Sequence, residues 1–430
     1  MSQENHDQTI LIVGNGQAAA TAVQTLRSHG FAGCIRVVGS EAHLAYERPP
    51  LSKTMLSDPD AGVSGLHIHP ADFYQDAGID LMLQKTVTRI DGERNMALLE
   101  DGQQLSYDYC LLATGGQARQ LPDYPYGDPH IHYLRTADDA LKLRDSLNAS
   151  SRVVIIGGGF LGMELASTTR MLGANVDVIE AADSLLARNA PGLFSEWLAQ
   201  RARHAGVTLH LGAKVLAATL QRTGQADAPV TLSLDSGRRL EADHLIVAIG
   251  LAPNTEVALR SGLAVCAQTG GIQIDHHGRT SMPNVFAAGD CATRINAETG
   301  ELIRIESWQN ANEQARVAVQ AMLGQTPAAA AFPWFWTDQF DCNIQMLGAT
   351  TAGLQFVQRG EMDASAAVPK FLLLGIKDSI PRYALAVNAG ADLRSLRPLL
   401  EKGIPIDPQA FGDVDLPVKQ FAKKTTAAAI

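Results

Sequence analysis

Two stretches of the chain repeat one pattern, in which an apolar strand runs directly into a glycine-rich turn and then into a helix. In the second copy, Val153–Ile156 is followed by Gly157, Gly159 and Gly162 in the spacing G-x-G-x-x-G. Four β-branched apolar residues predict a buried parallel strand. The first glycine allows a tight turn, the second lets the backbone approach a pyrophosphate, and the third lets the helix pack closely on the sheet. The stretch therefore predicts a site where a helix N-terminus binds phosphate.

A second strand, Asn175–Glu180, ends in a carboxylate 23 residues after Gly157. In a dinucleotide fold, an acid at this place accepts a hydrogen bond from the adenosine ribose and repels a 2′-phosphate. Glu180 therefore favours NAD over NADP. Taken alone, one such fingerprint could also be an ordinary strand–helix turn.

The other copy lies near the N-terminus. Thr9–Val13 precedes Gly14 and Gly16, Ala19 takes the place of the third glycine, and a helix and the strand Cys34–Glu41 follow. Alanine is a permitted variant at the third position. The duplication is the strong signal, because two dinucleotide-type units imply either two nucleotides or one nucleotide and one flavin.

Two strands with matching glycine ends, Tyr109–Gly116 and His244–Gly250, indicate that the chain crosses twice between these units. We therefore expect an α/β fold with two Rossmann-like dinucleotide-binding domains, the first of them discontinuous. After Phe332, dense aromatic residues and alternating strands predict an α+β domain with an antiparallel sheet, and the aromatic residues serve either a ligand or interdomain packing. The expected domains are 1–115 with 250–325, 116–249, and 326–430.

Composition narrows the classes of partner. The formal net charge of −10 over 430 residues argues against nucleic acid or anionic lipid as the main partner. The five cysteines are scattered without a close pair, so we expect no redox disulfide and no metal site, and most of them should be small buried residues. No apolar run reaches membrane-spanning length, and the polar start of the sequence lacks the apolar core of a signal peptide, so we expect a cytoplasmic protein.

Two further segments carry candidate site residues. Around two prolines that stiffen the loop, Arg48 could contact phosphate and Lys53 could lie deeper in a site, or both could form surface ion pairs. Asp290 follows an apolar strand and a glycine at an expected helix start, where it could accept from a ligand hydroxyl or cap the helix. A helix is expected to follow Arg304 and to run to about Leu323.

In combination these motifs resemble a known family. The two glycine fingerprints, with Ala113–Gly115 and Thr280–Asp290, are similar to those of glutathione-reductase-type flavoproteins, which bind FAD on the first unit and NAD(P) on the second. Within that superfamily, four segments resemble the NADH-dependent ferredoxin reductases of bacterial aromatic-ring dioxygenases and haem-thiolate monooxygenases. They are Arg48–Lys53, Gly157–Ala166, Arg304–Ser307 and Pro333–Gln339. The resemblance covers nearly the whole chain.

The resemblance implies a role for each matching position. The implied FAD-binding residues are Gly14, Gly16, Ala18, Ser40, Glu41, Arg48, Lys53, Val87, Thr114, Arg135, Asp290 and Trp308. Among them, Val87 would hold the adenine, Asp290 the ribityl chain and Trp308 the rim of the isoalloxazine. Family members often have an acid where Ser40 stands, so whether Ser40 or Glu41 binds the adenosine ribose stays open. The implied NAD-binding residues are Gly157, Gly159, Leu161, Gly162 and Glu180.

The same resemblance implies the catalytic pair and the reaction. Lys53 would lie beside the reactive ring of the flavin, paired with Glu164, and would stabilise the anionic reduced form. NADH would give a hydride, and the flavin would pass electrons singly to a two-iron two-sulfur ferredoxin that feeds a terminal oxygenase. The ferredoxin would bind transiently, at a basic patch for which Arg304, Lys370 and Arg382 are candidates.

Other reactions that this fold supports each require particular residues. Disulfide reductases need a cysteine pair, and peroxide-reducing relatives one reactive cysteine, soon after the first unit, but no cysteine lies between Ser40 and Lys53. Reduction of a small acceptor such as a quinone or a radical stays possible. A flavin- and NAD-binding protein of the apoptosis-inducing-factor type is the alternative from another class, and slow flavin reduction would distinguish it.

Overall fold

The computed structural model describes residues 7–220, 229–297, 299–327 and 331–428. The chain divides into two units. The first comprises the chain up to Arg48, Gly62–Gln117 and Leu251–Ala331, and the second comprises Pro49–Ala61, Ala118–Gly250 and the chain from Phe332 onward. The chain leaves the first unit along β8 (Gly116–Ala118) and returns along β17 (Leu251–Pro253), and these two strands pair.

The first unit is built on β1 (Thr9–Val13), which pairs in parallel with β2 (Cys34–Gly39) and β7 (Tyr109–Leu112). The sheet is completed by β3 (Ile79–Leu83) and β19 (Val285–Ala287), in the order β19-β7-β1-β2-β3, and every pair is parallel. The β1 side chains from residue 10 to 12 are at most 1 % exposed. Residues 10–13 of the strand are all apolar and buried, as expected where both faces of a parallel sheet are covered.

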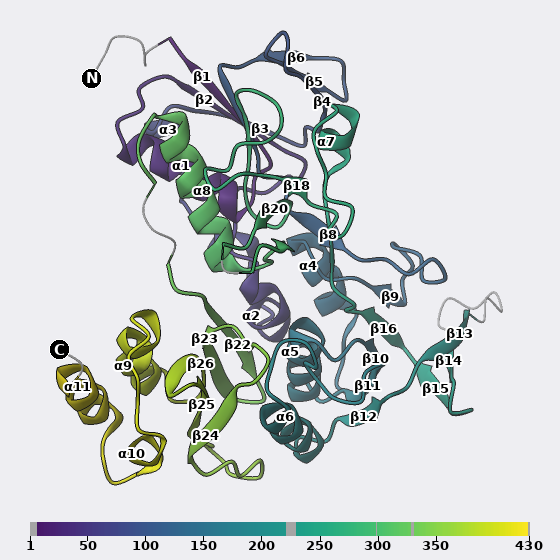
Figure 1. Ribbon diagram of the computed structural model, residues 1–430. Coiled ribbons are helices and arrows are strands. Elements are labelled where there is room, and N and C mark those ends of the chain that lie inside the picture. Colours follow the sequence, from purple (N-terminus) through teal and green to yellow (C-terminus); the bar gives the residue numbers. More distant parts are fainter. Residues whose placement is uncertain (1–6, 221–228, 298, 328–330, 429–430) are drawn as a thin grey trace. The chain divides into compact units, whose positions relative to one another are not determined.

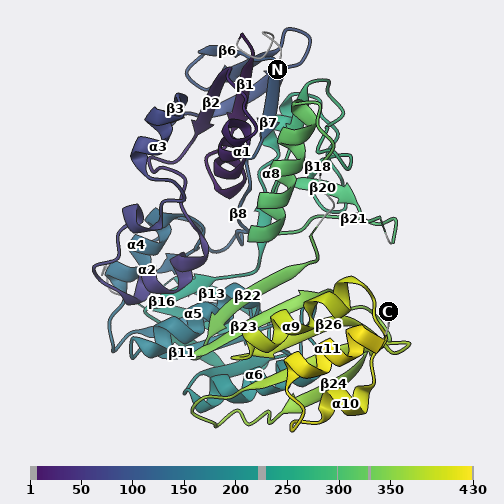
Figure 2. The same ribbon diagram turned by 90° about the vertical axis from the view of Figure 1, so that its left-hand side faces the viewer.

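Helices α1 (Gln17–Ser28) and α8 (Trp308–Met322) lie side by side against one face of this sheet (Figure 1, Figure 2). Their small apolar residues, such as Ala22 and Ala315, are completely buried and allow the close approach. Asn312 joins the two helices, because its Oδ1 accepts from Nε2 of Gln17 at 2.9 Å. The helix predicted after Arg304 is therefore present, and it begins at Trp308.

The other face of the first sheet is covered by smaller elements. An antiparallel sheet of three strands contributes Ile90, Ala97 and Leu105 to this core, and helix α7 contributes Val257 and Ala258. The bounds of these and the remaining elements of the unit are β4 (Val87–Asp91), β5 (Met96–Leu99), β6 (Gln104–Ser106), α3 (Ala71–Asp76), α7 (Glu256–Arg260), β18 (Ile272–Gln273), β20 (Ala292–Ile295) and β21 (Leu302–Ile303).

The second unit repeats the parallel architecture around β10 (Arg152–Ile156). Its sheet has the order β12-β11-β10-β16-β9, and all pairs are parallel. The antiparallel sheet β13-β14-β15 packs its apolar side chains into the same core, where Leu232 joins Val154 and Leu245. The bounds of the other elements are β9 (Ile131–His132), α4 (Ala137–Ser146), α5 (Phe160–Met171), β11 (Asn175–Glu180), α6 (Gly192–His204), β12 (Thr208–Leu211), β13 (Val215–Leu220), β14 (Val230–Leu234), β15 (Arg239–Ala242) and β16 (His244–Val247).

The C-terminal part of the second unit is an antiparallel sheet in the order β22-β23-β26-β25-β24. Helices α9 and α11 cover one face of it through an apolar core that includes Leu396, Leu399 and Phe421 (Figure 2). The bounds are β22 (Trp334–Gln339), β23 (Cys342–Gly348), β24 (Gln355–Gly360), β25 (Phe371–Lys377), β26 (Ile380–Val387), α9 (Gly390–Glu401), α10 (Pro408–Gly412) and α11 (Val418–Ala428). Helix α2 (Thr54–Ser57) and the 3₁₀ turn Pro49–Ser52 also belong to this unit.

The predicted fold class is confirmed, with two parallel sheets, a first unit made of separate segments, and a C-terminal antiparallel sheet. The boundaries of the three domains stay a prediction. One local expectation is wrong: no helix starts at Asp290, because the residues after it form strand β20, Ala292–Ile295. All five cysteines are unpaired, and only Cys34 is exposed. Among the described residues, no helix is both long and apolar enough to cross a bilayer.

Candidate functional site

The glycine loop of the first unit connects β1 to α1. Gly14 has φ +115°, and a Cβ there would lie 2.1 Å from the carbonyl oxygen of Ala113, so this turn requires glycine. Gly16 is the N-cap of α1 and has no side chain to cap the helix, and the first turn of the helix contains no acidic residue. The helix N-terminus, with Ala18 in its first turn, therefore leaves backbone amide groups available for an anion, and their contact with the FAD pyrophosphate stays a prediction.

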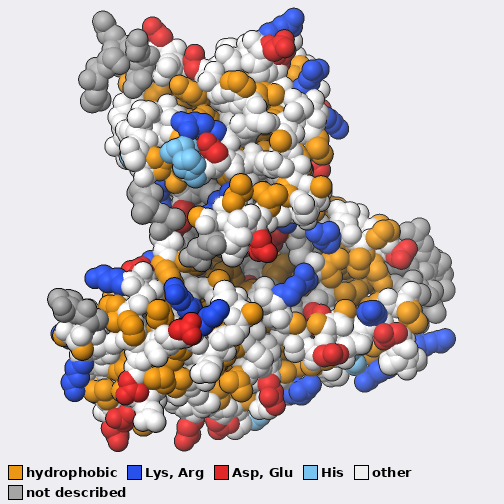
Figure 3. All heavy atoms as spheres, viewed as in Figure 1, with side chains coloured by type: hydrophobic (Ala, Val, Ile, Leu, Met, Phe, Trp, Pro, Cys, Tyr) orange, Lys and Arg blue, Asp and Glu red, His pale blue; other side chains and the backbone are white. Residues whose placement is uncertain are grey.

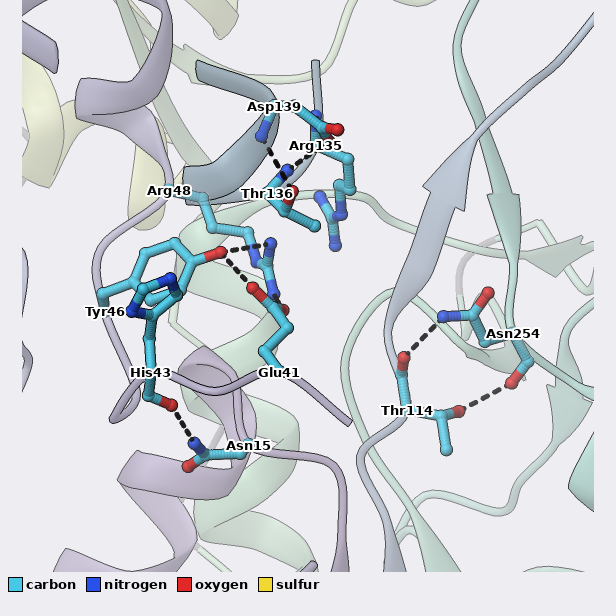
Figure 4. Close-up of polar contacts among 10 residues, drawn as sticks. All are labelled: Asn15, Glu41, His43, Tyr46, Arg48, Thr114, Arg135, Thr136, Asp139 and Asn254. Carbon is cyan, nitrogen blue, oxygen red and sulfur yellow. Dashed lines mark hydrogen bonds and ion pairs between the residues drawn. The ribbon is translucent and has the colours of Figure 1, made fainter. Parts of the chain in front are cut away.

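The loop is held against the segment that follows β2. Nδ2 of Asn15 donates to the carbonyl oxygen of His43 at 2.9 Å (Figure 4). Gly39 permits this contact, because a Cβ there would lie 2.5 Å from the Cβ of Asn15. Hydrogen bonding and close packing thus fix the phosphate loop in place.

Glu41, Tyr46 and Arg48 form a cluster beside this loop (Figure 4). Nη2 of Arg48 lies 2.7 Å from Oε1 of Glu41, the Tyr46 hydroxyl donates to Oε2 of Glu41, and the guanidinium stands over the Tyr46 ring at 5.1 Å. Burial alone would lower the pKa of Arg48, but Tyr46 and Glu41 outweigh it and raise that pKa. Both carboxylate oxygens of Glu41 already form hydrogen bonds within the cluster, whereas Ser40 is exposed. Which of the two residues binds the adenosine ribose therefore stays a prediction.

Three further residues of the first unit stand at the ends of strands or on them. Oγ1 of Thr114 donates to the carbonyl oxygen of Asn254 at 2.6 Å, and Nδ2 of Asn254 donates back to the carbonyl of Thr114 at 3.0 Å (Figure 4). This reciprocal pair fixes the end of β7. Val87, on β4, is 6 % exposed. Gly289 brings the loop of Asp290 next to helix α1, since a Cβ on Gly289 would lie 3.4 Å from that of Ala18.

Trp308 opens helix α8, and its indole is held by an acid that the sequence did not single out. Nε1 of Trp308 donates to Oε2 of Glu47 at 2.9 Å. Burial raises the pKa of the Glu47 carboxyl, and the hydrogen bond from Trp308 opposes that rise. The predicted flavin-rim residue therefore has a defined orientation. No short-range pattern could have indicated this contact, because the two residues lie on distant segments.

The glycine loop of the second unit repeats the first. Gly157 has φ +112°, and a Cβ on Gly162 would lie 1.9 Å from the Gly157 carbonyl oxygen, so helix α5 starts directly on the turn. Gly159 is the N-cap, with open space where a Cβ would be, and Leu161 follows it in the half-buried first turn. Glu180 closes the loop, because its Oε2 accepts from the amide of Gly158 at 2.6 Å.

Arg135 stands one residue before the N-cap of α4. Its backbone amide donates to Oδ2 of Asp139 at 3.1 Å, and Thr136 and Asp139 form a capping box (Figure 4). The capping box fixes the backbone from which the Arg135 side chain extends.

The predicted catalytic pair is formed within the second unit. Nζ of Lys53 lies 2.8 Å from Oε1 of Glu164, and both side chains are largely buried. Two hydroxyls that the sequence did not single out also bind this carboxylate, from Ser52 to Oε2 at 2.5 Å and from Thr337 to Oε1 at 2.6 Å. Lys53 therefore forms a largely buried ion pair, and the alternative of a surface ion pair is wrong for this residue.

The candidates for a basic docking patch differ in exposure. Arg304 is about 10 % exposed and donates to the backbone carbonyls of Thr269 and Asp290, so it supports the Asp290 loop. Lys370 is 64 % exposed, and Arg382 is exposed as well. Acidic and basic side chains intermingle on the face drawn in Figure 3. Among the described residues, no group of three or more His, Cys, Asp or Glu side chains is arranged to hold a metal ion.

The two glycine loops, each at the end of its own parallel sheet, define a protein with two dinucleotide-type binding units. Residues 8–315 match the pyridine nucleotide-disulphide oxidoreductase family, and residues 334–422 match the reductase C-terminal family. The chain belongs to the pyridine nucleotide-disulphide oxidoreductase family, whose cofactors are FAD and NAD(H). The resemblance found in the sequence is confirmed, whereas the role of each individual site residue stays a prediction.

Named relatives match over nearly their whole length. The ferredoxin–NAD(+) reductase component of the 3-phenylpropionate/cinnamic acid dioxygenase from Photorhabdus laumondii is 39 % identical, with 92 % of this chain and 96 % of the relative covered. Rhodocoxin reductase from Rhodococcus erythropolis is 37 % identical, with 96 % and 93 % covered. Putidaredoxin reductase in its covalent complex with putidaredoxin matches with a TM-score of 0.90 and 33 % identity, over 99 % of each chain.

Proposed function

We propose that the chain is an NADH-dependent ferredoxin reductase that supplies electrons, one at a time, to a two-iron two-sulfur ferredoxin. The observation that carries the proposal is the match, over 99 % of both chains, to a reductase captured together with its ferredoxin. The relatives from Photorhabdus laumondii and Pseudomonas putida are named as reductase components of dioxygenase systems. We therefore propose that the ferredoxin binds transiently and serves a terminal oxygenase.

The chain supports this reaction by binding and orientation. The amides at Gly16 and Ala18 are proposed to bind the FAD pyrophosphate, and those at Gly159 and Leu161 the NADH pyrophosphate. A bound flavin supplies the chemistry, because it can accept two electrons as hydride and release them singly. Lys53 contributes a positive charge to the flavin site, and Glu164 holds its ammonium group in place.

The three predicted domains are proposed as functional parts. Residues 1–115 and 250–325 would bind FAD, residues 116–249 NADH, and residues 326–430 would complete the reductase. Separate parallel sheets on the first two parts and an antiparallel sheet on the third support this division.

A location in the cytoplasm is proposed as well, supported by five unpaired cysteines and the need for NADH. Cell fractionation followed by immunoblotting tests that location.

Electron flow to cytochrome c tests the proposed function. Purified protein with NADH should reduce cytochrome c slowly alone, and many-fold faster when a two-iron two-sulfur ferredoxin from a dioxygenase or haem-thiolate monooxygenase system is added. A ferredoxin whose cluster has been removed is the control. Fast turnover with a quinone and none with any ferredoxin would instead indicate a small-acceptor reductase, and slow flavin reduction by NADH would indicate a binding protein.

A further inference from the structure

The carboxylate of Glu164 has three donors, which come from two segments that are far apart in the sequence. Lys53 reaches Oε1 from the loop after the 3₁₀ turn, Ser52 donates to Oε2, and Thr337 donates to Oε1 from strand β22. Glu164 is 8 % exposed and Thr337 is fully buried. A buried carboxylate with three donors has little freedom to rotate, so its orientation depends on each of them.

The direction of the Thr337 hydroxyl bond is fixed by its neighbour. Nε2 of Gln339 donates to Oγ1 of Thr337 at 3.0 Å and faces the Phe160 carbonyl oxygen at 3.4 Å. A backbone carbonyl can only accept, which sets the orientation of the Gln339 amide. Thr337 therefore accepts from Gln339 and directs its own proton to Glu164.

Strand β22 is tied to helix α5 on both sides of Thr337. The rings of Phe335 and Phe160 pack with centroids 4.5 Å apart, and the amide of Phe340 donates to Oγ of Ser167 at 2.6 Å. Residues 335, 337 and 339 alternate along the strand and so share one face. These contacts fix the register in which residue 337, and no neighbour on the strand, meets Glu164.

We propose that Thr337 is a positioning residue for the hydride-transfer step, acting through Glu164 on Lys53. By holding Oε1 it fixes the carboxylate that in turn fixes the Lys53 ammonium group. The C-terminal strand β22 thus takes part in preparing the flavin site. This inference rests on the proposed function, in which Lys53 contributes its charge to that site.

Three variants test the inference. Thr337→Val removes the hydroxyl at nearly constant volume, and Thr337→Ser restores it. Thr169→Val is the matched control, because Thr169 is also fully buried and lies on α5, but its hydroxyl donates to the carbonyl of Leu165 and not to Glu164. The first readout is the rate at which an amine-acylating reagent modifies Lys53, followed by mass spectrometry of the peptide. The second is the rate of flavin reduction by NADH in a stopped-flow spectrophotometer, together with the flavin midpoint potential.

In Thr337→Val we expect Lys53 to be acylated roughly fivefold faster and the flavin to be reduced roughly fivefold to tenfold more slowly, about the worth of one hydrogen bond. Its midpoint potential should become more negative. Thr337→Ser and Thr169→Val should behave as the wild type in all three measurements. Equal Lys53 acylation in Thr337→Val and the wild type would overturn the inference.

A fourth variant, Gln339→Met, covers the case in which Thr337→Val does not fold. Gln339→Met removes the donor that directs the Thr337 hydroxyl, and it should raise the Lys53 acylation rate by about twofold. An unchanged acylation rate there would also overturn the inference. The acylation rates need no electron transfer, so they decide the role of Thr337 even if the wild-type flavin is not reduced by NADH, a result that would count only against the proposed function.

Discussion

Gly14 and Gly157 occupy equivalent places in the two parallel sheets. A Cβ on Gly14 would lie 2.1 Å from the carbonyl oxygen of Ala113, and a Cβ on Gly157 would lie 2.3 Å from that of Ala248. In both loops the glycine has a positive φ and crosses the end of a neighbouring strand. The two nucleotide-binding units therefore use the same turn, built from the same backbone contact.

Substitutions at two glycines of the second loop should have different effects, one on protein stability and the other on nucleotide binding. Gly162→Ala would place a Cβ 1.9 Å from a backbone oxygen, so we expect a destabilised protein with a lower melting temperature. Gly159 has φ −78° and open space around its missing Cβ, so Gly159→Ala should keep the melting temperature. It should still weaken NADH binding about tenfold or more, because the new methyl group occupies the path of the pyrophosphate. Isothermal titration with NAD⁺, which binds the same loop but cannot reduce the flavin, and thermal melting check both. Equal NAD⁺ affinity in Gly159→Ala and the wild type would contradict the assignment.

The charge of Lys53 should matter for reduction of the flavin. Lys53→Met removes the ammonium group that lies 2.8 Å from Glu164, and we expect the rate of flavin reduction by NADH to fall about a hundredfold. Lys85→Met is the control, because Lys85 forms an exposed ion pair with Asp101. Stopped-flow absorbance at saturating NADH measures the rate. A Lys53→Met protein as fast as the control would exclude an electrostatic role for Lys53.

The sequence predicted those features whose signal is local. Apolar runs and glycine spacing identified β1, β10 and both phosphate loops, and alternation identified a C-terminal sheet whose last strand ends at Val387. The expectation of a helix at Asp290 is wrong, because an acidic residue after a glycine turn is equally compatible with a helix cap and with a connection to a strand. The polar contacts of Thr337 with Glu164 and of Trp308 with Glu47 were missed. A hydroxyl or an indole on one segment carries no signal of which distant side chain it meets.

Glu180 should set the preference for NADH over NADPH. Its Oε1 accepts from the amide of Ala182 at 2.8 Å, and its Oε2 from that of Gly158, so the carboxylate lies directly at the phosphate loop. Glu180→Gln keeps an acceptor but removes the charge that repels a 2′-phosphate. We expect the ratio of kcat/KM for NADH to that for NADPH to fall about tenfold, roughly the effect of one charge contact. Steady-state rates with both nucleotides measure it, with Glu241→Gln as a surface control, and an unchanged ratio would count against the role of Glu180.

A largely buried pair of histidines should make stability depend on pH. Nε2 of His132 lies 3.2 Å from Nδ1 of His244, and burial, followed by the charges of His244 and His130, lowers the pKa of His132 to about 4. The unfolded chain binds this proton near pH 6.5, so stability is full above that pH and is lost as the pH falls toward 4, by up to about 3 kcal/mol.

Replacing His132 should remove much of this loss. In His132→Gln the difference in unfolding free energy between pH 7 and pH 5 should be smaller than in the wild type, whereas His29→Gln, at an exposed position, should leave it unchanged. Urea unfolding at the two pH values provides the measurement. A wild-type pH dependence in His132→Gln would show that His132 is not the group responsible.

We infer that one chain binds FAD and NADH so that hydride passes from the nicotinamide to the flavin. An anaerobic titration of the purified protein with NADH, followed in the visible spectrum, tests it most directly. We expect a yellow protein with one FAD per chain, whose flavin absorbance is bleached by about one equivalent of NADH. A colourless protein that cannot be reconstituted with FAD, or a bound flavin that NADH leaves oxidised, would contradict it.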